Sequence, residues 1–242
     1  MENKWNDSDA KAAIKKYSDV AEDIALRVYT SRLIGADPSL VLHGGGNTSV
    51  KLRTFNKVNE EVDVLYVKGS GWDLDTLEPP GLPGVLLDHL QKLRNLARLS
   101  DEEMVNEQRT HLLDASSPNP SVETLLHAFL PHKFIDHSHA DASLIIANQP
   151  DAEKICREIY GDKIGVVSYF MPGFALAKAS AEIYEKNPNV EGLMLINHGL
   201  FSFGNTAKES YDRHIHAVTL AETYIQKKTL KPLSSLESPA LK

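Results

Sequence analysis

Two short apolar runs, GLMLI at residues 192–196 and LFSFG at residues 200–204, are separated only by Asn197, His198 and Gly199. Apolar runs of this length, bounded by turn residues, predict a pair of buried strands. A long helical pattern follows over residues 206–227. Because buried strands must be covered, this part of the chain predicts a sheet packed against helices.

The rest of the chain repeats this mixture of short strands and helices. Apolar or alternating runs predict strands at 39–42, around Val50 and Leu52, and at 62–68, 134–139 and 163–169, with a hairpin loop at 55–60. Three- and four-residue spacing predicts helices at 8–34, 84–98, 101–114, 121–130, 142–149 and 174–187. We therefore expect an α/β fold: one three-layer αβα domain over residues 1–228 with a largely antiparallel central sheet. Residues 229–242 form a Ser/Pro-rich tail or a truncated linker.

Charge and composition exclude several functions. The formal net charge of −7 over 242 residues argues against a nucleic-acid surface, which needs clustered Lys and Arg. No apolar run approaches the length of a membrane span, and the polar N-terminus lacks the apolar core of a signal peptide. Cys156 is the only cysteine, so neither an intrachain disulfide nor a cysteine-based zinc cage can form. We expect a soluble, cytoplasmic protein.

Histidines are the first candidates for chemistry. In the predicted strand FIDHSH, His137 and His139 point to the same face because side chains alternate along a strand. Such a pair can chelate a divalent ion, or it can simply be exposed or hydrogen-bonded. A catalytic zinc needs a third protein ligand. His198, which leaves an apolar strand just before a glycine, is one candidate, although it can equally be a hydrogen-bonded core residue.

The candidate acid lies in the segment NPSVETLLHAFL. Val122, Leu125, Leu126 and Phe129 make one apolar helix face, and Glu123 lies off that face with His127 one turn further along. An acid in the first helical turn complements the helix dipole, which is the interpretation that the pattern favours. The alternative is that Glu123 is a base or a metal ligand.

Two glycine clusters, HGGGNTS at residues 43–49 and KGSG at residues 68–71, lie at predicted strand ends. Neither matches a P-loop or a dinucleotide-binding fingerprint. Glycine-rich turns can form backbone nests for anions, and with Asn47, Lys68 and Ser70 nearby a phosphate or carboxylate could bind. The alternative is that both clusters are only tight turns.

The order GGGNTS, KGSG, PSVE, HSH, NHG resembles the class II aldolase/adducin family over residues 20–227. The details GGGNTSVK, VKGSG, DHSHADA, MPGFALAK and HGLFSFG look most like the aldolase part of bifunctional rhamnulose-1-phosphate aldolase/alcohol dehydrogenases. The resemblance implies a divalent ion, usually zinc, held by His137, His139 and His198. It makes Glu123 a metal ligand in the resting state and the catalytic acid/base once substrate displaces it.

The resemblance also implies a sugar-phosphate substrate and an assembly of several copies, usually a homotetramer. Phosphate-binding positions of the family fall on the following residues: Gly46, Asn47, Ser70, Gly71 and Ser121. Two departures stand out. The serine pair that precedes the glutamate in fuculose-phosphate aldolases is Ser121-Val122 here, and none of the candidate proton-donating tyrosines lies in a family motif. Those tyrosines are Tyr169, Tyr184, Tyr211 and Tyr224.

The implied function is a metal-dependent aldolase that cleaves a phosphorylated ketose to dihydroxyacetone phosphate and an aldehyde. Alternatives within the same family are a sugar-phosphate 4-epimerase, a thiosugar-phosphate dehydratase and a non-catalytic adducin-like binding module. Epimerases tend to carry HGPFxWG, whereas this chain has HGLFSFG. A binding module need not retain three histidines and Glu123.

Overall fold

The computed structural model describes residues 1–229. Residues 230–242, which make up nearly all of the predicted tail or linker, lie outside the described part. The strands are β1 (Asn47–Phe55), β2 (Glu61–Val67), β3 (Gly84–Leu86), β4 (Phe134–Ser138), β5 (Ile164–Val167), β6 (Gly192–Leu195) and β7 (Gly199–Gly204). The helices are α1 (Asp7–Lys16), α2 (Glu22–Gly35), η1 (Pro79–Gly81), α3 (Leu87–Leu93), α4 (Asp101–Thr110), α5 (Thr124–Phe129), α6 (Asp141–Ala147), α7 (Ala152–Tyr160), α8 (Phe174–Lys186) and α9 (Ala207–Thr229).

The strands form one sheet in the order β3-β2-β1-β4-β7-β6-β5. Every neighbouring pair is antiparallel except β5 and β6, so the predicted α/β fold with a largely antiparallel sheet is confirmed. The predicted hairpin at residues 55–60 joins β1 to β2. The two apolar runs at 192–204 are the antiparallel pair β6 and β7.

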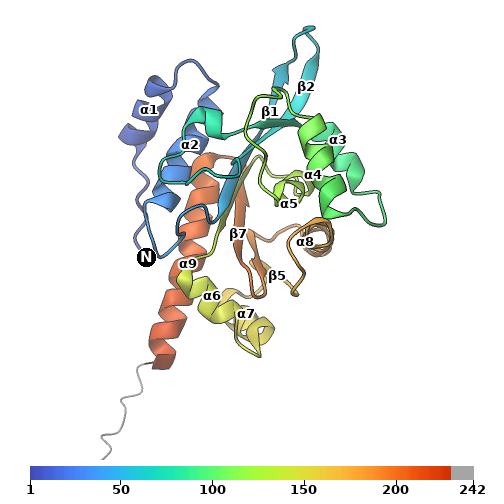
Figure 1. Cartoon of the computed structure of the whole chain (residues 1–242). Coiled ribbons are helices and arrows are strands. Elements are labelled where there is room, and N and C mark those ends of the chain that lie inside the picture. The colour runs from blue at the N-terminus through green and yellow to red at the C-terminus, as the bar shows by residue number, and fades with distance from the viewer. Residues whose placement is uncertain (230–242) are drawn as a thin grey trace, which may run out of the picture.

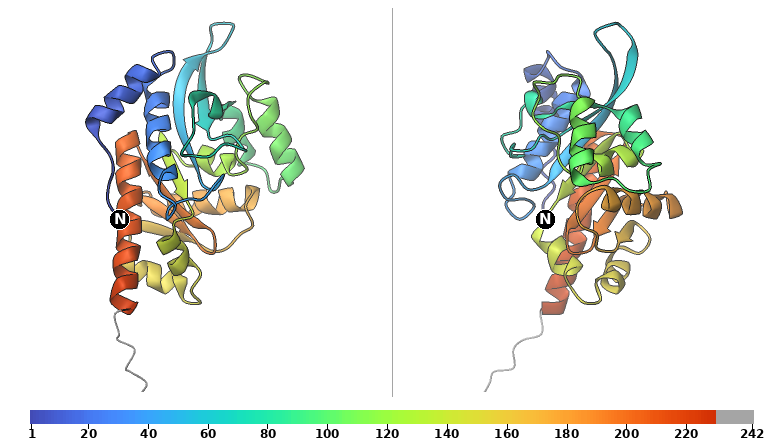
Figure 2. Two further views of the ribbon diagram at one scale, coloured as in Figure 1. Left: turned by 60° about the vertical axis from the view of Figure 1, so that its left-hand side comes forward. Right: turned by 45° about the vertical axis from the view of Figure 1, so that its right-hand side comes forward.

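Helices cover the sheet on both faces, which makes three layers (Figure 1). Helices α2 and α9 pack on one face, with α1 packed on the outer side of α2, and α3, α4, α5 and α8 lie on the other face, as the turned views also show (Figure 2). Successive strand residues enter different cores because side chains alternate: Phe134 packs towards α2 and α9, whereas Ile135 packs towards α5 and α8. An apolar core therefore lies on each side of the sheet. No helix in residues 1–229 combines the length and apolar character that a membrane span requires.

Three local predictions were wrong. The helix expected over 8–34 is two helices, because α1 ends at Tyr17 and the chain reverses so that α1 packs against α2. The strand expected at 39–42 is a set of turns, in which Leu40 N–H donates to Asp37 O at 2.9 Å; Leu40 is buried without joining the sheet. The helix expected at 84–98 begins only at Leu87, because residues 84–86 pair with β2 as the edge strand β3.

The remaining helices agree with the sequence pattern in position, with ends that differ by a few residues. Helix α4 begins with the predicted capping box, in which Ser100 and Glu103 exchange hydrogen bonds. Helix α7 was not predicted. It buries Ala152, Cys156 and Tyr160 along one side, at the four-residue spacing of a helix face.

Candidate active site

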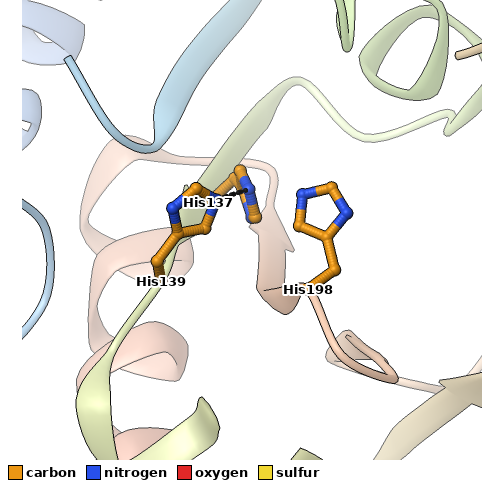
Figure 3. A group of neighbouring side chains, drawn as sticks. All are labelled: His137, His139 and His198. Atoms are coloured by element: carbon orange, nitrogen blue, oxygen red, sulfur yellow. Dashed lines mark hydrogen bonds between the residues drawn. The ribbon is translucent and has the colours of Figure 1, made fainter. Parts of the chain in front are cut away.

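Three histidines from two parts of the chain meet at one end of the central strands (Figure 3). His137 is the fourth residue of β4, where it lies between Asn47 of β1 and Phe201 of β7. His139 follows the end of β4, and His198 lies in the turn between β6 and β7. One nitrogen from each imidazole lies within 4.8 Å of the others. The structure thus brings together the three histidines that the sequence singled out.

The turn that carries His198 has a backbone that few residues can adopt. Asn197 has a φ of 58°, in the left-handed region that asparagine tolerates better than most residues. At Gly199, where φ is 157°, a Cβ atom would lie 2.5 Å from Ser138 O and 3.1 Å from His137 Cε1. The glycine therefore allows the β6–β7 turn to lie close against β4, which brings His198 next to His137.

Glu123 directly precedes α5 and is 7% exposed. Its Oε1 lies 3.0 Å from His198 Nε2, and its Oε2 lies 3.3 Å from His137 Nε2. The carboxylate makes no capping hydrogen bond to α5, so its side chain belongs to the histidine cluster and does not serve the helix end. The predicted apolar face is wrong at Val122, which lies outside the helix and is exposed.

A chain of hydrogen bonds orients the Glu123 carboxylate. Asn47 Nδ2 donates to Glu123 Oε2 at 2.6 Å, while Asn47 Oδ1 accepts from His127 Nε2. His127 Nδ1 in turn accepts from the hydroxyl of Ser49 at 2.7 Å. These partners fix both the amide orientation of Asn47 and the tautomer of His127. His127, which the sequence placed only on the same side as Glu123, is thus linked to the acid through Asn47.

The lone pair of His137 faces the Glu123 carboxylate. His137 Nδ1–H donates to Leu200 O at 3.0 Å, so the neutral ring carries its lone pair on Nε2. That nitrogen accepts a hydrogen bond from His139 Nε2 at 3.1 Å and lies 3.3 Å from Glu123 Oε2. Among the described residues, Glu123 Oε1 has no hydrogen bond of satisfactory geometry, although His198 lies near it. Facing acceptors repel unless a positive charge lies between them.

Burial disfavours a proton on two of the histidines in this cluster. It holds the pKa of His137 well below its usual range, and it also lowers the pKa of His139. For Glu123, burial raises the pKa, but the imidazoles of His137 and His198 and the Asn47 amide outweigh it, so the pKa lies below its ordinary value. Neutral imidazoles around a buried carboxylate, with one imidazole N–H held by a carbonyl, are the donor set of a zinc-type site. The residues present therefore fit a divalent ion.

The two glycine clusters lie beside this site. At Gly46, where φ is 67°, a Cβ atom would lie 2.7 Å from His137 O, so the turn that leads into Asn47 requires glycine there. Lys68 follows β2 and is buried; its Nζ donates to Gly44 O at 3.2 Å. Burial lowers the pKa of Lys68, while the charges of Asp73 and Glu123 raise it.

Backbone hydrogen bonds join the remaining predicted phosphate residues. Gly69 bridges to Pro120, Ser70 N–H donates to Asn119 O at 2.7 Å, and Ser121 N–H donates to Lys68 O at 3.1 Å. Ser70 and Gly71 are exposed, and a Cβ atom on Gly71 would meet nothing within 4 Å. The hydroxyl of Ser121 lies 3.1 Å from Asn47 Nδ2, which donates to it. Ser70 and Gly71 therefore border open space beside Lys68, whereas Asn47 points at Glu123.

The opposite face of β4 carries a polar network that the sequence analysis missed. Asp136 pairs with Arg27, and both side chains are fully buried. Ser210 also donates to Asp136, and His214 bonds Ser138 and Ser202 at 2.7 and 2.9 Å. Asp136 and Ser138 alternate with His137 along the strand. Their ion pair and hydrogen bonds therefore hold β4 from the face opposite His137. Alternation of polar residues in DHSH was the only sequence signal for it.

The chain is similar to known proteins in sequence and in structure. The family model described as class II aldolase and adducin N-terminal domain matches residues 26–225. An uncharacterized oxidoreductase, YuxG, of Bacillus subtilis (strain 168) is 40% identical over 198 residues, which are 82% of this chain and 29% of that protein. The chain thus spans less than a third of the length of this relative.

Two of the similar solved structures show how the likeness extends. The N-terminal class II aldolase domain of a conserved protein from Thermoplasma acidophilum is 42% identical, with a TM-score of 0.83, and the match covers 93% of this chain and 99% of that one. A sugar-phosphate aldolase from Thermotoga maritima is 16% identical, with a TM-score of 0.66, and the match covers 87% and 96% of the two chains. The second similarity concerns the fold alone.

Proposed function

The chain belongs to the class II aldolase and adducin family, as its motif order predicted, and on this premise we propose that it is a metal-dependent aldehyde-lyase. Its proposed reaction cleaves a phosphorylated ketose, of the rhamnulose or fuculose 1-phosphate type, to dihydroxyacetone phosphate and an aldehyde. The observation that carries this proposal is the buried Glu123 carboxylate, whose oxygens face the His137 and His198 Nε2 atoms at 3.3 and 3.0 Å.

His137, His139 and His198 would hold the ion, with Glu123 as a further ligand before substrate binds. A divalent ion, with zinc as the expected one, supplies Lewis-acid stabilisation of the negative charge that develops beside the carbonyl when the carbon–carbon bond breaks. The Leu200 carbonyl orients the His137 ring through Nδ1–H, which keeps Nε2 directed into the cluster. No Schiff-base lysine is required.

Glu123 is the proposed acid/base. When the bond breaks, the hydroxyl on the carbon that becomes the aldehyde loses its proton to the Glu123 carboxylate, and the carbon that stays with the phosphate-bearing fragment keeps the electron pair of the bond. The carboxyl formed in this way then delivers a proton to that carbon. In the synthesis direction the carboxylate removes the same proton. Asn47 holds Oε2 through a hydrogen bond of 2.6 Å, which leaves Oε1 for the substrate side. Proton transfer by a positioned side chain typically contributes about 10²–10⁴-fold to rate.

The remote phosphate is proposed to bind where Ser70 and Gly71 border open space. Lys68 adds a buried ammonium that donates to Gly44 O, and the Ser121 hydroxyl lies on the adjoining segment. An anchored phosphate holds the reacting carbons in place relative to Glu123, which lowers the entropic part of the barrier. Neither glycine cluster matches a dinucleotide fingerprint, so we propose lyase chemistry for this chain and not redox chemistry.

The deciding experiment combines metal analysis with a substrate panel. Purified protein should contain close to one ion per chain at this site, and His198→Ala should lose it. With the ion present, ketose 1-phosphates that differ in stereochemistry are tested for release of dihydroxyacetone phosphate, with His216→Ala as the control. A product that is an epimeric sugar phosphate, with no dihydroxyacetone phosphate, would replace the aldolase proposal by a 4-epimerase. No turnover and no ion would indicate a binding module.

A further inference from the structure

A second group of metal-ligating side chains lies between two helices that contribute nothing to the first site. His89 belongs to α3, Glu107 belongs to α4, and His111 is the residue at which α4 ends. One ligand atom from each of the three side chains lies within 4.8 Å of the others. Glu107 and His111 are four residues apart, so they occupy the same face of α4.

The three side chains are held together by short contacts. His89 Nε2 lies 2.6 Å from Glu107 Oε2, and His111 Nδ1 lies 3.9 Å from the same oxygen. The two imidazole rings stack with their centroids 3.3 Å apart and their planes at 7°. A carboxylate flanked by two imidazoles on one side is thus already assembled before any ion binds.

The protonation of His111 leaves one nitrogen free for an ion. Its Nδ1–H donates to the backbone carbonyl of Glu107 at 2.8 Å, so in the neutral ring the lone pair is on Nε2. Metal-ligating histidines in proteins are commonly oriented in this way, by donating the other ring N–H to a carbonyl. The side chains of His89, Glu107 and His111 are 30%, 30% and 27% exposed, so solvent reaches all three.

From this arrangement we propose that His89, Glu107 and His111 form a second divalent transition-metal site, separate from the cluster at Glu123. Two imidazoles and one carboxylate are a ligand set that binds Zn²⁺, and mixed nitrogen and oxygen donors also suit Ni²⁺ and Cu²⁺. Solvent supplies the remaining ligands because all three side chains are partly exposed.

An ion at this site would connect α3 to the end of α4. Leu86 N–H donates to His111 O at 3.0 Å, and Val85 bridges to Leu112, so His111 also adjoins the edge strand β3. The segment that follows, residues 113–120, leads directly to Ser121 and Glu123. The ion therefore stabilises the start of the segment that positions the proposed acid/base.

The test is ion stoichiometry by equilibrium dialysis of the chelator-treated protein against Zn²⁺. Wild-type protein should bind two ions per chain, whereas His89→Ala and His111→Ala should each bind one. His216→Ala, which removes an exposed histidine from α9, is the matched control and should bind two. The melting temperatures of the ion-free variants establish that each is folded.

His198→Ala separates this proposal from the proposed active site. If both sites exist, this variant retains one ion, and Cu²⁺ bound to it should show nitrogen hyperfine coupling that disappears when His111→Ala is added. If wild-type protein binds a single ion that His111→Ala removes and His198→Ala keeps, the second site stands and the proposed active-site metal fails. If the ion content of His89→Ala and His111→Ala equals that of wild type, the second site is refuted.

Discussion

At the residue scale, Glu123 is an acid whose neighbours decide its state. Burial alone would favour a neutral carboxyl, yet two imidazoles and an amide hydrogen bond lower its pKa below the usual value. It lies before the first turn of α5, and it makes no capping contact. Its location is therefore better explained by the chemistry of the cluster than by the helix dipole.

We predict that Glu123→Gln lowers the retro-aldol turnover number by about 10²-fold or more, because an isosteric amide cannot carry the proton. Three imidazoles remain, so the ion should be retained. Glu102→Gln is the matched control, since Glu102 is an exposed acid in the first turn of α4. It should cost at most about 1 kcal/mol of stability and leave turnover unchanged. Near-normal turnover in Glu123→Gln, with a large fall in melting temperature, would contradict the proposed role.

A second prediction concerns His127, which reaches Glu123 only through Asn47. His127→Leu removes the donor to Asn47 Oδ1, so the amide is free to turn its oxygen towards the carboxylate. Zinc affinity, measured by competition with a chelator, should fall by about 10–100-fold, the usual cost of losing an outer-shell partner. His127→Gln retains an N–H donor and should restore most of the affinity.

Melting temperature separates this positioning role from a purely structural one. Burial of an unpaired acceptor costs about 1–3 kcal/mol, so His127→Leu should also be less stable. If it loses stability but binds zinc as tightly as wild type, His127 serves the fold alone.

At the element scale, β4 carries polar side chains on both faces, and each face has different partners. One face presents His137 to the proposed metal site, and the other presents Asp136 and Ser138 to Arg27 and His214. Removing one partner of a buried ion pair typically lowers the free energy of unfolding by about 3–5 kcal/mol. Substitution of Arg27 or Asp136 should therefore destabilise β4. The metal-ligand candidates thus depend on a network that lies on the opposite face of the strand.

This network predicts a pH dependence of stability. Burial lowers the pKa of His214 to about 4, below the ordinary value of 6.5. Between these two values the unfolded chain binds a proton that the folded chain does not, so stability is lost as pH falls from 6.5 towards 4. One such histidine changes the free energy of unfolding by up to about 1.4 kcal/mol per pH unit.

Urea midpoints between pH 4.5 and 7 measure this effect above the range where most carboxylates titrate. His214→Gln should give a shallower slope than wild type, and His216→Ala, whose side chain is exposed, should leave the slope unchanged. Equal slopes in His214→Gln and wild type would show that burial of His214 is not responsible. His127, whose pKa burial lowers to about 3, contributes to the slope that remains.

The sequence predicted helices and strands well where the periodic pattern extended over many residues. It predicted them poorly where contacts with other parts of the fold determine the conformation. Apolar or alternating runs identified β1, β2, β4 and the β6–β7 pair, and with them the placement of His137 and His198. Residues 39–42 and 84–86 were misassigned because short apolar segments take their conformation from their neighbours. The HxH pair was visible, but nothing in the pattern showed that Asn47 would point at Glu123, since that contact joins residues 76 positions apart.

At the scale of the whole molecule, large apolar side chains are exposed in three loops, two of which adjoin residues of the proposed site. Leu42, Val122 and Met171 are 62%, 55% and 71% exposed. Leu42 precedes the first glycine cluster, Val122 lies between Ser121 and Glu123, and Met171 is in the loop after β5. Exposed apolar groups of this size often mark contacts between proteins. They support the expectation that copies of the chain contact one another.

We therefore predict a homo-oligomer, a tetramer by analogy with the family, in analytical ultracentrifugation at micromolar concentration. Met171→Asp should shift the chain towards smaller species because it places a charge in the contact. Val58→Asp alters an equally exposed apolar residue at the tip of the β1–β2 hairpin and should leave the assembly intact. A fully active monomer would contradict this prediction.

The two hairpins of the sheet differ in how much extra chain they can accept. The β6–β7 turn has no spare residue: Gly199 pairs with Leu195, and its backbone lies against Ser138 O. One inserted residue there would move His198 away from His137. The β1–β2 hairpin projects beyond the helices, and its tip, residues 56–60, lies far along the strands from Asn47 (Figure 1). A peptide tag or a fluorescent label can therefore be inserted at residues 57–59 while the end of β1 that lies at the proposed active site keeps its register.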